Sequence, residues 1–410
     1  MKKFFALLLS LAMVLALVAC GQKDPTPDTP DTPDDPQTKV EYKVAMITDY
    51  GDITDQSFNQ TTYEACKAFA EDNSIEFSYF KPAGDNTADR VAMIEKAVDE
   101  GFNVIVMPGY AFGGAIVEAA PEFPDVKFIA LDVAASDLLE TAVAKAGEAY
   151  DYTPENWDLN KYVDMSNVYC AVYQEELCGY MAGYAAVKLG YKNLGFLGGM
   201  SVPAVVRYGY GFVQGVDAAA ADLGLTDVKL NYIYGGQFFG DADITAVMDT
   251  WYQGGTEVVF ACGGGIYTSA VDAAKKVGAK VIGVDVDQAG VIANYAGVDG
   301  MTVTSAMKGL YPATYDTLTD VIVNGNWEKY VGKIETLGLV SGTDPEANYV
   351  QIPMGDGTQW SDSFTQDDYK AMVKDMFDGK ITVSNNTSSD VSAADFATVI
   401  TVDDQGSIKG

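Results

Sequence analysis

Short apolar runs alternate along the chain with longer stretches in which apolar residues recur every three or four positions. The runs are rich in β-branched residues and apolar throughout, which is typical of parallel strands buried on both faces. The expected strands are residues 44–47, 77–80, 104–107, 128–131, 168–172, 194–197, 230–234, 258–261 and 281–284. The expected helices are residues 57–71, 87–100, 113–121, 178–189, 208–223, 244–253 and 268–277. This order predicts an α/β fold in which doubly wound parallel sheets are flanked by helices.

A polar stretch at residues 151–166 separates two series of these units. The folded part is roughly 370 residues long, which is more than one hydrophobic core commonly holds. We therefore expect lobe I at residues 40–165, lobe II at 166–306, a return to lobe I at 307–340, and a C-terminal segment at 341–410 that crosses back towards lobe II. Because ligands bind outside the carboxyl ends of strands in such sheets, the loops there are candidate walls of a site.

The first residues have the pattern of an export signal. Lys2 and Lys3 precede an apolar run that is shorter than the roughly 20 residues of a membrane span. Residues 1–19 are expected to be a signal peptide, and the Leu-Val-Ala-Cys site at its end resembles the lipobox of bacterial lipoproteins. That resemblance implies that Cys20 is acylated and becomes the new N-terminus. The alternative is an ordinary signal peptide cut nearby, with Cys20 a spare thiol.

Residues 20–39 join the acylated Cys20 to a stretch of Pro, Thr and Asp with almost nothing apolar to bury. Such a composition favours an extended polyproline II tether. We therefore expect the protein to be held on the extracytoplasmic side of the cell membrane by lipid chains on Cys20.

The composition excludes several kinds of chemistry. A formal net charge of -32 opposes binding to nucleic acid, because a phosphate backbone would be repelled. The chain has no histidine, which removes histidine-based catalysis and most transition-metal sites. Four cysteines besides Cys20 match no zinc or redox spacing, and whether any of them form a disulfide cannot be deduced from spacing. We expect neither a cofactor nor a metal.

The loop after the first expected strand carries the densest candidate chemistry. It reads Thr-Asp-Tyr-Gly-Asp-Ile-Thr-Asp-Gln-Ser-Phe-Asn-Gln over residues 48–60. Phe58 offers a flat apolar face and Asn59 a paired donor and acceptor, a combination that suits a heteroaromatic base or a sugar ring. The alternative is that Phe58 is a core residue at the helix start, while Asp55 and Ser57 only cap the helix.

This loop resembles the T-D-x-G-x-x-D-x-S-F-N-Q signature of the basic membrane protein family, the nucleoside-binding lipoproteins of ABC importers. The resemblance continues in order through residues 128–132, 182–184, 282–288 and 302–308. It implies a two-lobed, periplasmic-binding-protein-like fold of type I, without catalysis.

The resemblance also implies roles for individual residues in lobe I. Phe58 would stack on a purine, and Asn59 and Asp49 would lie beside it. Asp132, at the end of an F-x-x-x-D strand, would accept hydrogen bonds from the base edge. A carboxylate suits that role because charge-assisted hydrogen bonds are the stronger kind. Without the resemblance, an isolated Asp132 would be an ordinary strand-end residue or helix cap.

The sugar contacts would come from lobe II and from the start of the return to lobe I. Asp285 would accept from two adjacent ribose hydroxyls, and Lys308 would donate to sugar oxygens, although a lone lysine is as often a surface residue. The glycine-rich loop with Gly263 and Gly264 lets the backbone approach a ligand. It lacks the ending of a P-loop, so a phosphate cradle is the weaker interpretation.

A second stacking aromatic is expected on lobe II. Phe239 is our choice, with Phe238 as the alternative, because the chain has two adjacent Phe residues where the family has one before an acidic turn. The polar stretch around Trp157 also departs from the family, and both departures leave the base preference open.

We interpret the chain as a lipid-anchored solute-binding protein that captures a purine nucleoside for an ABC permease. Two lobes would close over the ligand. Alternatives within the binding class are another nucleoside, a sugar or another small polar ligand. A sensory or adhesive surface lipoprotein remains open, because fold does not fix function. We expect no enzyme, since nothing in the sequence places two carboxylates at the separation a hydrolase needs.

Overall fold

The computed structural model describes residues 41–409, and residues 42–409 belong to one compact unit. The expected signal peptide at 1–19, the expected acylation site Cys20 and the expected tether up to residue 39 lie outside the described residues. No helix among residues 41–409 is long and apolar enough to cross a membrane.

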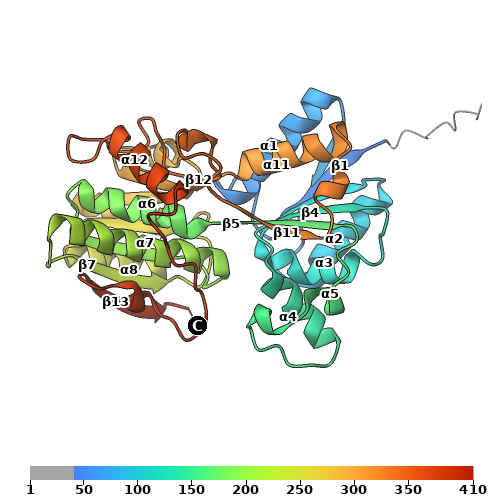
Figure 1. Cartoon of the computed structure of the whole chain (residues 1–410), viewed down its shortest axis with the longest axis horizontal. Coiled ribbons are helices and arrows are strands. Elements are labelled where there is room, and N and C mark those ends of the chain that lie inside the picture. Colours follow the sequence, from blue (N-terminus) through green and yellow to red (C-terminus); the bar gives the residue numbers. More distant parts are fainter. Residues whose placement is uncertain (1–40, 410) are drawn as a thin grey trace, which may run out of the picture. The chain divides into compact units, whose positions relative to one another are not determined.

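Lobe I is built on a parallel sheet with the strand order β11-β5-β4-β3-β1-β2 among the described residues. These strands are β1 (Lys43–Ile47), β2 (Glu76–Phe80), β3 (Val104–Pro108), β4 (Lys127–Leu131), β5 (Val168–Tyr173) and β11 (Lys333–Leu337). One face is covered by α1 (Phe58–Asn73) and α11 (Leu310–Leu318). The other is covered by α2 (Thr87–Asp99), α3 (Gly113–Ala119) and α4 (Ala135–Lys145), as Figure 1 shows.

Lobe II is built on a second sheet with the order β12-β10-β9-β8-β6-β7-β13, in which β12 alone of the described strands is antiparallel. The strands are β6 (Asn193–Gly198), β7 (Lys229–Tyr234), β8 (Val258–Cys262), β9 (Lys280–Asp285), β10 (Thr302–Lys308), β12 (Val350–Gln351) and β13 (Thr401–Ser407). Its helices are α6 (Glu175–Lys188) and α7 (Pro203–Leu223) on one face, and α8 (Ala242–Gln253), α9 (Tyr267–Val277) and α10 (Ala289–Ala296) on the other.

Shorter elements complete the described chain. They are α5 (Leu159–Tyr162), α12 (Gln366–Phe377), η1 (Tyr110–Phe112), η2 (Pro154–Asn156), η3 (Thr319–Val323), η4 (Trp327–Lys329), η5 (Pro345–Ala347) and η6 (Ala393–Phe396).

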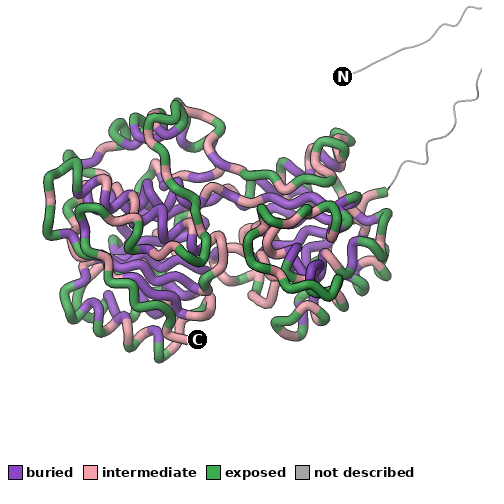
Figure 2. Tube along the Cα trace, turned by 60° about the horizontal axis from the view of Figure 1, so that its bottom comes forward, coloured by how far each residue is buried: buried purple, intermediate pink, exposed green. Residues whose placement is uncertain are grey.

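Each strand contributes side chains to both faces of its sheet. Val44 and Met46 of β1 face α1, whereas Ala45 and Ile47 face the helices on the other side. All four are fully buried, as expected for strands whose side chains alternate between two covered faces. Figure 2 shows the buried trace, in purple, concentrated in the strands of both lobes. The buried parallel strands and their flanking helices therefore confirm the α/β class that the apolar runs predicted.

The expected start of lobe II at residue 166 is wrong. Strand β5 was assigned to lobe II, but it pairs with β4 and β11 in the sheet of lobe I. The chain passes to lobe II only after Tyr173, where α6 begins. An apolar run indicates that a strand is buried, but it does not indicate which strand it pairs with, because pairing depends on contacts between residues far apart in the sequence. The polar stretch at 151–166 is an excursion between two strands of one sheet.

Both sheets are doubly wound, with a reversal of strand order between β1 and β3 in lobe I and between β6 and β8 in lobe II. Ligands in such sheets bind at these switch points, outside the carboxyl ends of the strands. The loops that leave these four strands and the strands beside them carry the residues of the cavity described next.

Candidate ligand-binding site

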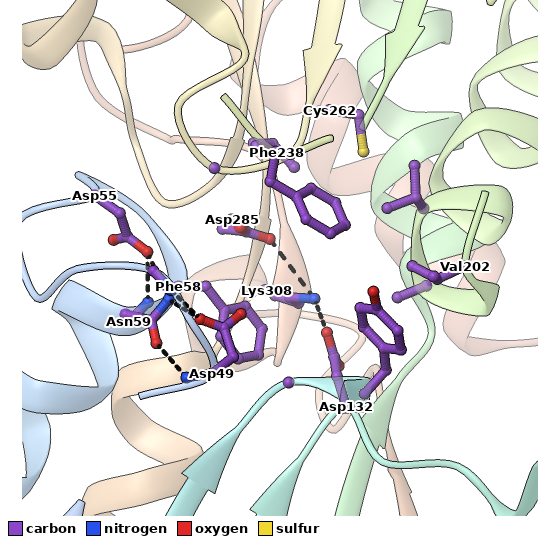
Figure 3. Close-up of a pocket in the computed structure, with 18 of the residues that line it drawn as sticks. Asp49, Asp55, Phe58, Asn59, Asp132, Val202, Phe238, Cys262, Asp285 and Lys308 are labelled. Atoms are coloured by element: carbon purple, nitrogen blue, oxygen red, sulfur yellow. Dashed lines mark hydrogen bonds and ion pairs between the residues drawn. The ribbon is translucent and has the colours of Figure 1, made fainter. Parts of the chain in front are cut away.

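A cavity of about 470 Å³ lies where the carboxyl-end loops of the two sheets meet. Lobe I contributes the loop after β1, Gly109 and Tyr110 after β3, and Asp132 after β4. Lobe II contributes the start of α7, the loops around Phe238 and Gly263, and the strand ends at Asp285 and Lys308. Figure 3 shows ten of these side chains labelled around the cavity. All nine residues expected from the sequence to bind a ligand line it.

The loop after β1 is fixed by its own side chains. Asp55 accepts hydrogen bonds from the backbone N–H groups of Ser57 (2.9 Å), Asn59 (2.9 Å) and Gln60 (3.1 Å), so it caps α1. The Asn59 Nδ2 donates to Asp55 Oδ2 (3.0 Å) and Asp49 Oδ1 (3.1 Å). Burial raises the pKa of both carboxyls. Phe58 is left half-buried, with its ring on the cavity wall.

Lys308 lies at the centre of the site and is nearly fully buried, with 3 % of its side chain exposed. Its ammonium contacts Asp132 of lobe I, and lies 3.5 Å from Glu175 Oε1 and 3.7 Å from Asp285 Oδ1. Burial opposes its charge, but the carboxylates around it raise its pKa. The ammonium also lies 4.7 Å from the centroid of the Phe58 ring, a cation–π contact. Lys308 is thus the charged centre that both lobes share.

Asp132 and Asp285 end their strands in the left-handed region of the backbone, with φ angles of 57° and 65°. This conformation costs a residue with a side chain about 1–2 kcal/mol, and such strain gathers at functional sites. It turns both carboxylates out of their sheets and towards Lys308 between them, as Figure 3 shows.

The carboxylates of Asp132 and Asp285 differ in their hydrogen-bond partners. Asp285 Oδ2 accepts from Ser57 Oγ of lobe I at 2.6 Å, and Oδ1 accepts from Tyr208 at 3.3 Å. Asp132 Oδ1 is buried and has no hydrogen-bond partner among the described residues. Burial raises the pKa of Asp132 to about 7, against the opposing pull of Lys308. Burial likewise raises the pKa of Asp137, which lines the cavity beside it, to about 7.

The choice of Phe239 as the second aromatic does not fit the structure. Phe239 is 54 % exposed, whereas the ring of Phe238 points into the cavity in Figure 3 and lies 6.5 Å from the ring of Tyr110 in lobe I. A Cβ on Gly263 would lie 2.7 Å from the Phe238 ring, so that glycine, with φ of 144°, makes room for the ring. Two adjacent Phe residues in one loop do not reveal which of them faces inwards.

Sequence reasoning also missed a group of residues at this site. Tyr208 falls at a helical spacing that is typical of a core or surface residue, yet it lines the cavity and donates to Asp285. Arg207 lines the cavity and donates through Nε to the buried Glu175 at 2.7 Å. Both belong to the helix that starts after β6, so the signal that was available is the position of that loop at the carboxyl end of a central strand. No group of residues in the described part of the chain could hold a metal ion.

The family model described as ABC transporter substrate-binding protein PnrA-like matches residues 42–343. The chain belongs to this PnrA-like family. The match covers both sheets except β12 and β13, and it includes every cavity residue named above.

Similar proteins agree with this family. The nucleoside-binding ABC transporter protein BmpA of Lactococcus lactis subsp. cremoris is 25 % identical over 92 % of this chain and 96 % of its own. An uncharacterized lipoprotein of Pyrococcus abyssi is 25 % identical over 74 % of this chain and 69 % of its own. A solved ABC transporter solute-binding protein of Aeropyrum pernix shares the fold, with a TM-score of 0.59 at 20 % identity over 84 % and 88 % of the two chains. Members of the PnrA-like family are substrate-binding components of ABC transporters, which bind small molecules for a permease.

Proposed function

We propose that this member of the family is a lipid-anchored protein that captures a purine nucleoside between its lobes and delivers it to a permease. The observation that carries the proposal is the pairing of two aromatic walls with an open acceptor. Phe58 of lobe I and Phe238 of lobe II line one cavity, and the buried Asp132 Oδ1 has no donor among residues 41–409. A purine offers a flat ring for such walls and N–H groups for such an acceptor.

The charges of the cavity favour a neutral ligand. Six aspartates and three cationic side chains line it, namely Asp49, Asp52, Asp55, Asp132, Asp137, Asp285, Lys81, Arg207 and Lys308. An added phosphate would meet a surplus of carboxylates, whereas hydroxyl and N–H groups would satisfy them. This balance supports a nucleoside over a nucleotide.

We assign the ribose to the side of Asp285, Lys308 and the Gly263–Gly264 backbone. The carboxylate and the ammonium lie side by side there, so two vicinal hydroxyls can meet one acceptor and one donor. The lactococcal relative BmpA is named a nucleoside-binding protein, which supports the same ligand class.

Anchoring rests on the sequence before the described residues and on a relative that is named a lipoprotein. Cys20→Ser should abolish acylation and release the protein from the membrane or leave it unprocessed. Metabolic labelling with palmitate, followed by membrane fractionation, checks this. Labelling that persists in the variant contradicts the assignment of Cys20.

A thermal-shift series tests the ligand class. A ligand at 100 times its Kd adds about 2.7 kcal/mol to the stability of the native state. Guanosine, inosine and adenosine should raise the unfolding temperature, their 5′-monophosphates much less, and free ribose hardly at all. Stabilisation by hexoses or pentoses with no response to nucleosides would favour the sugar alternative instead.

A further inference from the structure

The loop that carries Phe238 contacts the C-terminal end of the described chain. Strand β13 pairs in parallel with β7, the strand that leads into this loop. Beyond β13, Ile408 N donates to Tyr234 O at 2.8 Å, where β7 ends. Residues 408 and 409 therefore run alongside the first residues of the loop Gly235–Asp241.

Lys409 ties together the two ends of this loop. Its ammonium donates to Gln237 Oε1 at 2.8 Å and forms an ion pair with Asp241. Gln237 Nε2 in turn donates to Asp241 Oδ2 at 3.0 Å. The three side chains close a ring of polar contacts across the dipeptide of Phe238 and Phe239.

The backbone of the loop is shaped to the same segment. Gly236 has φ of 79°, and a Cβ there would lie 2.7 Å from the carbonyl oxygen of Lys409. The loop can therefore turn at this point only because residue 236 has no side chain and takes a left-handed conformation.

On the cavity side, the loop is held by different partners. Phe238 O accepts from Gly265 N at 2.9 Å, and the ring lies against Gly199 and Gly263. The loop is thus held between the glycine-rich loop on one side and Lys409 on the other. The residues on the cavity side lie within the stretch that the family model matches, and Lys409 lies beyond it.

We propose that Lys409 is a positioning residue for ligand binding: it fixes the loop of Gly235–Asp241 so that Phe238 presents its ring to the ligand. The proposal rests on the proposed function only for the identity of that ligand. Lys409 and Asp241 are about one third exposed, so their ion pair contributes little to global stability. Its effect is on the mobility of one loop.

The experiment compares the full chain with Lys409→Ala and Lys409→Arg, and uses Lys374→Ala as the matched control. Lys374 on α12 forms an ion pair with Asp378, the residue that follows this helix, and the pair is more exposed than that of Lys409 and lies away from the cavity. Amide hydrogen exchange of residues 235–241 in the ligand-free protein is the first measurement, because it does not depend on knowing the ligand. Lys409→Ala should speed exchange there about two- to tenfold, while Lys409→Arg and Lys374→Ala should not. Unchanged exchange in Lys409→Ala overturns the proposal.

Guanosine dissociation is the second measurement. Lys409→Ala should raise the dissociation rate about two- to tenfold, Lys409→Arg should restore it, and the effect should vanish in a Phe238→Ala background. An equal effect in that background, or faster loop exchange with unchanged dissociation, overturns the positioning role. If the wild-type chain binds no nucleoside, the proposed function fails, and the exchange measurement still decides whether Lys409 holds the loop.

Discussion

Two loops supply the aromatic walls of the cavity, and they are held in place in different ways. The loop with Phe58 is fixed mainly from within, because Asp49, Asp55 and Asn59 bond to each other and to nearby backbone. Arg90 and Gln288 add hydrogen bonds to its backbone from elsewhere in the chain. The loop with Phe238 is fixed mainly from outside, by Gly265 and Lys409. Each loop begins at the end of a strand and contains an aspartate that caps the next helix.

The difference explains which wall the sequence reveals. A loop that is stabilised by hydrogen bonds among its own residues must keep its polar residues at fixed short spacings. Such a loop therefore forms a contiguous sequence motif. A loop held by distant segments needs only small residues and one ring, and its partners appear only when the chain is folded. The same contrast predicts where substitutions act locally and where they act across the molecule.

The largest effect is expected at Asp285, where lobe II meets Ser57 of the loop with Phe58. Asp285→Ala should weaken nucleoside binding by about 2–5 kcal/mol, because it removes an acceptor from a buried charge cluster that includes Lys308. Calorimetry with guanosine and guanine measures it. Free guanine should lose much less, since the sugar contacts are absent.

Ser57→Ala is the matched control for this substitution. It removes the 2.6 Å hydrogen bond across the cleft but keeps the carboxylate, so it should cost about 0.5–1.5 kcal/mol for nucleoside and base alike. Equal losses for nucleoside and base in Asp285→Ala itself would show that Asp285 acts only through closure of the lobes.

Next in size are the two rings. Phe58→Ala and Phe238→Ala should each weaken nucleoside binding by about 1–3 kcal/mol, by analogy with base–aromatic stacking elsewhere. Phe239→Ala should change it little, because that side chain is exposed. Fluorescence or calorimetric titration distinguishes them. A larger loss for Phe239→Ala than for Phe238→Ala would reverse the assignment made from the structure.

A smaller effect is expected from pH. The pKa of Asp132 is raised to about 7, so its carboxyl holds a proton below that pH and is then a weaker acceptor for an N–H group of a base than the carboxylate is. Guanosine affinity should therefore rise about tenfold between pH 6 and pH 8. Asp132→Asn should remove this dependence.

The ligand-free protein should show the opposite trend in stability. A carboxyl with a raised folded-state pKa contributes stability below its unfolded value, near 4, and loses it as the pH rises through 7. Thermal unfolding of the ligand-free chain at pH 5 and pH 8 checks this sign.

Guanosine affinity that falls as the pH rises would contradict the role given to Asp132 in ligand binding.

The smallest effects concern Asp55 and Asp241, the aspartates of the two loops that cap helices α1 and α8. Asp55→Ala should lower the free energy of unfolding by about 1–2 kcal/mol, because three backbone N–H groups lose their acceptor. Asp241→Ala should cost less, about 0.5–1 kcal/mol, because it accepts only one helix N–H, from Ile244. Urea denaturation measures both. A larger loss for Asp241→Ala would mean that the second loop is also fixed mainly from within.

Much of the fold follows from the sequence because apolar runs and helical spacing are local signals. The nine expected strands coincide with β1 to β9 to within two residues at each end. Strands β10 to β13 are not among these nine, since β10 carries polar Thr and Ser residues, β11 and β13 are largely exposed and β12 has two residues; β13, Thr401–Ser407, has only one half-buried residue. The wrong lobe for β5 has a related cause, because pairing partners far along the chain leave no local mark.

The site residues also differ in whether a local sequence signal or tertiary packing determines their position. Asp49, Phe58 and Asn59 were found because their motif is contiguous, and Asp132 and Asp285 because the family resemblance extends to the ends of two apolar strands. Glu175, Arg207 and Tyr208 were not, because their approach to Lys308 depends on how α6 and α7 pack against each other. Helical spacing places Tyr208 on an apolar face without telling a cavity wall from a core.

Isothermal titration of the full chain with inosine is the most direct test of nucleoside capture between the lobes. We expect one nucleoside bound per chain, a negative heat-capacity change from burial of the base between Phe58 and Phe238, and loss of most of that signal in Phe58→Ala. Inosine binding that is absent in the wild type, or unchanged in Phe58→Ala and Asp285→Ala, would contradict it.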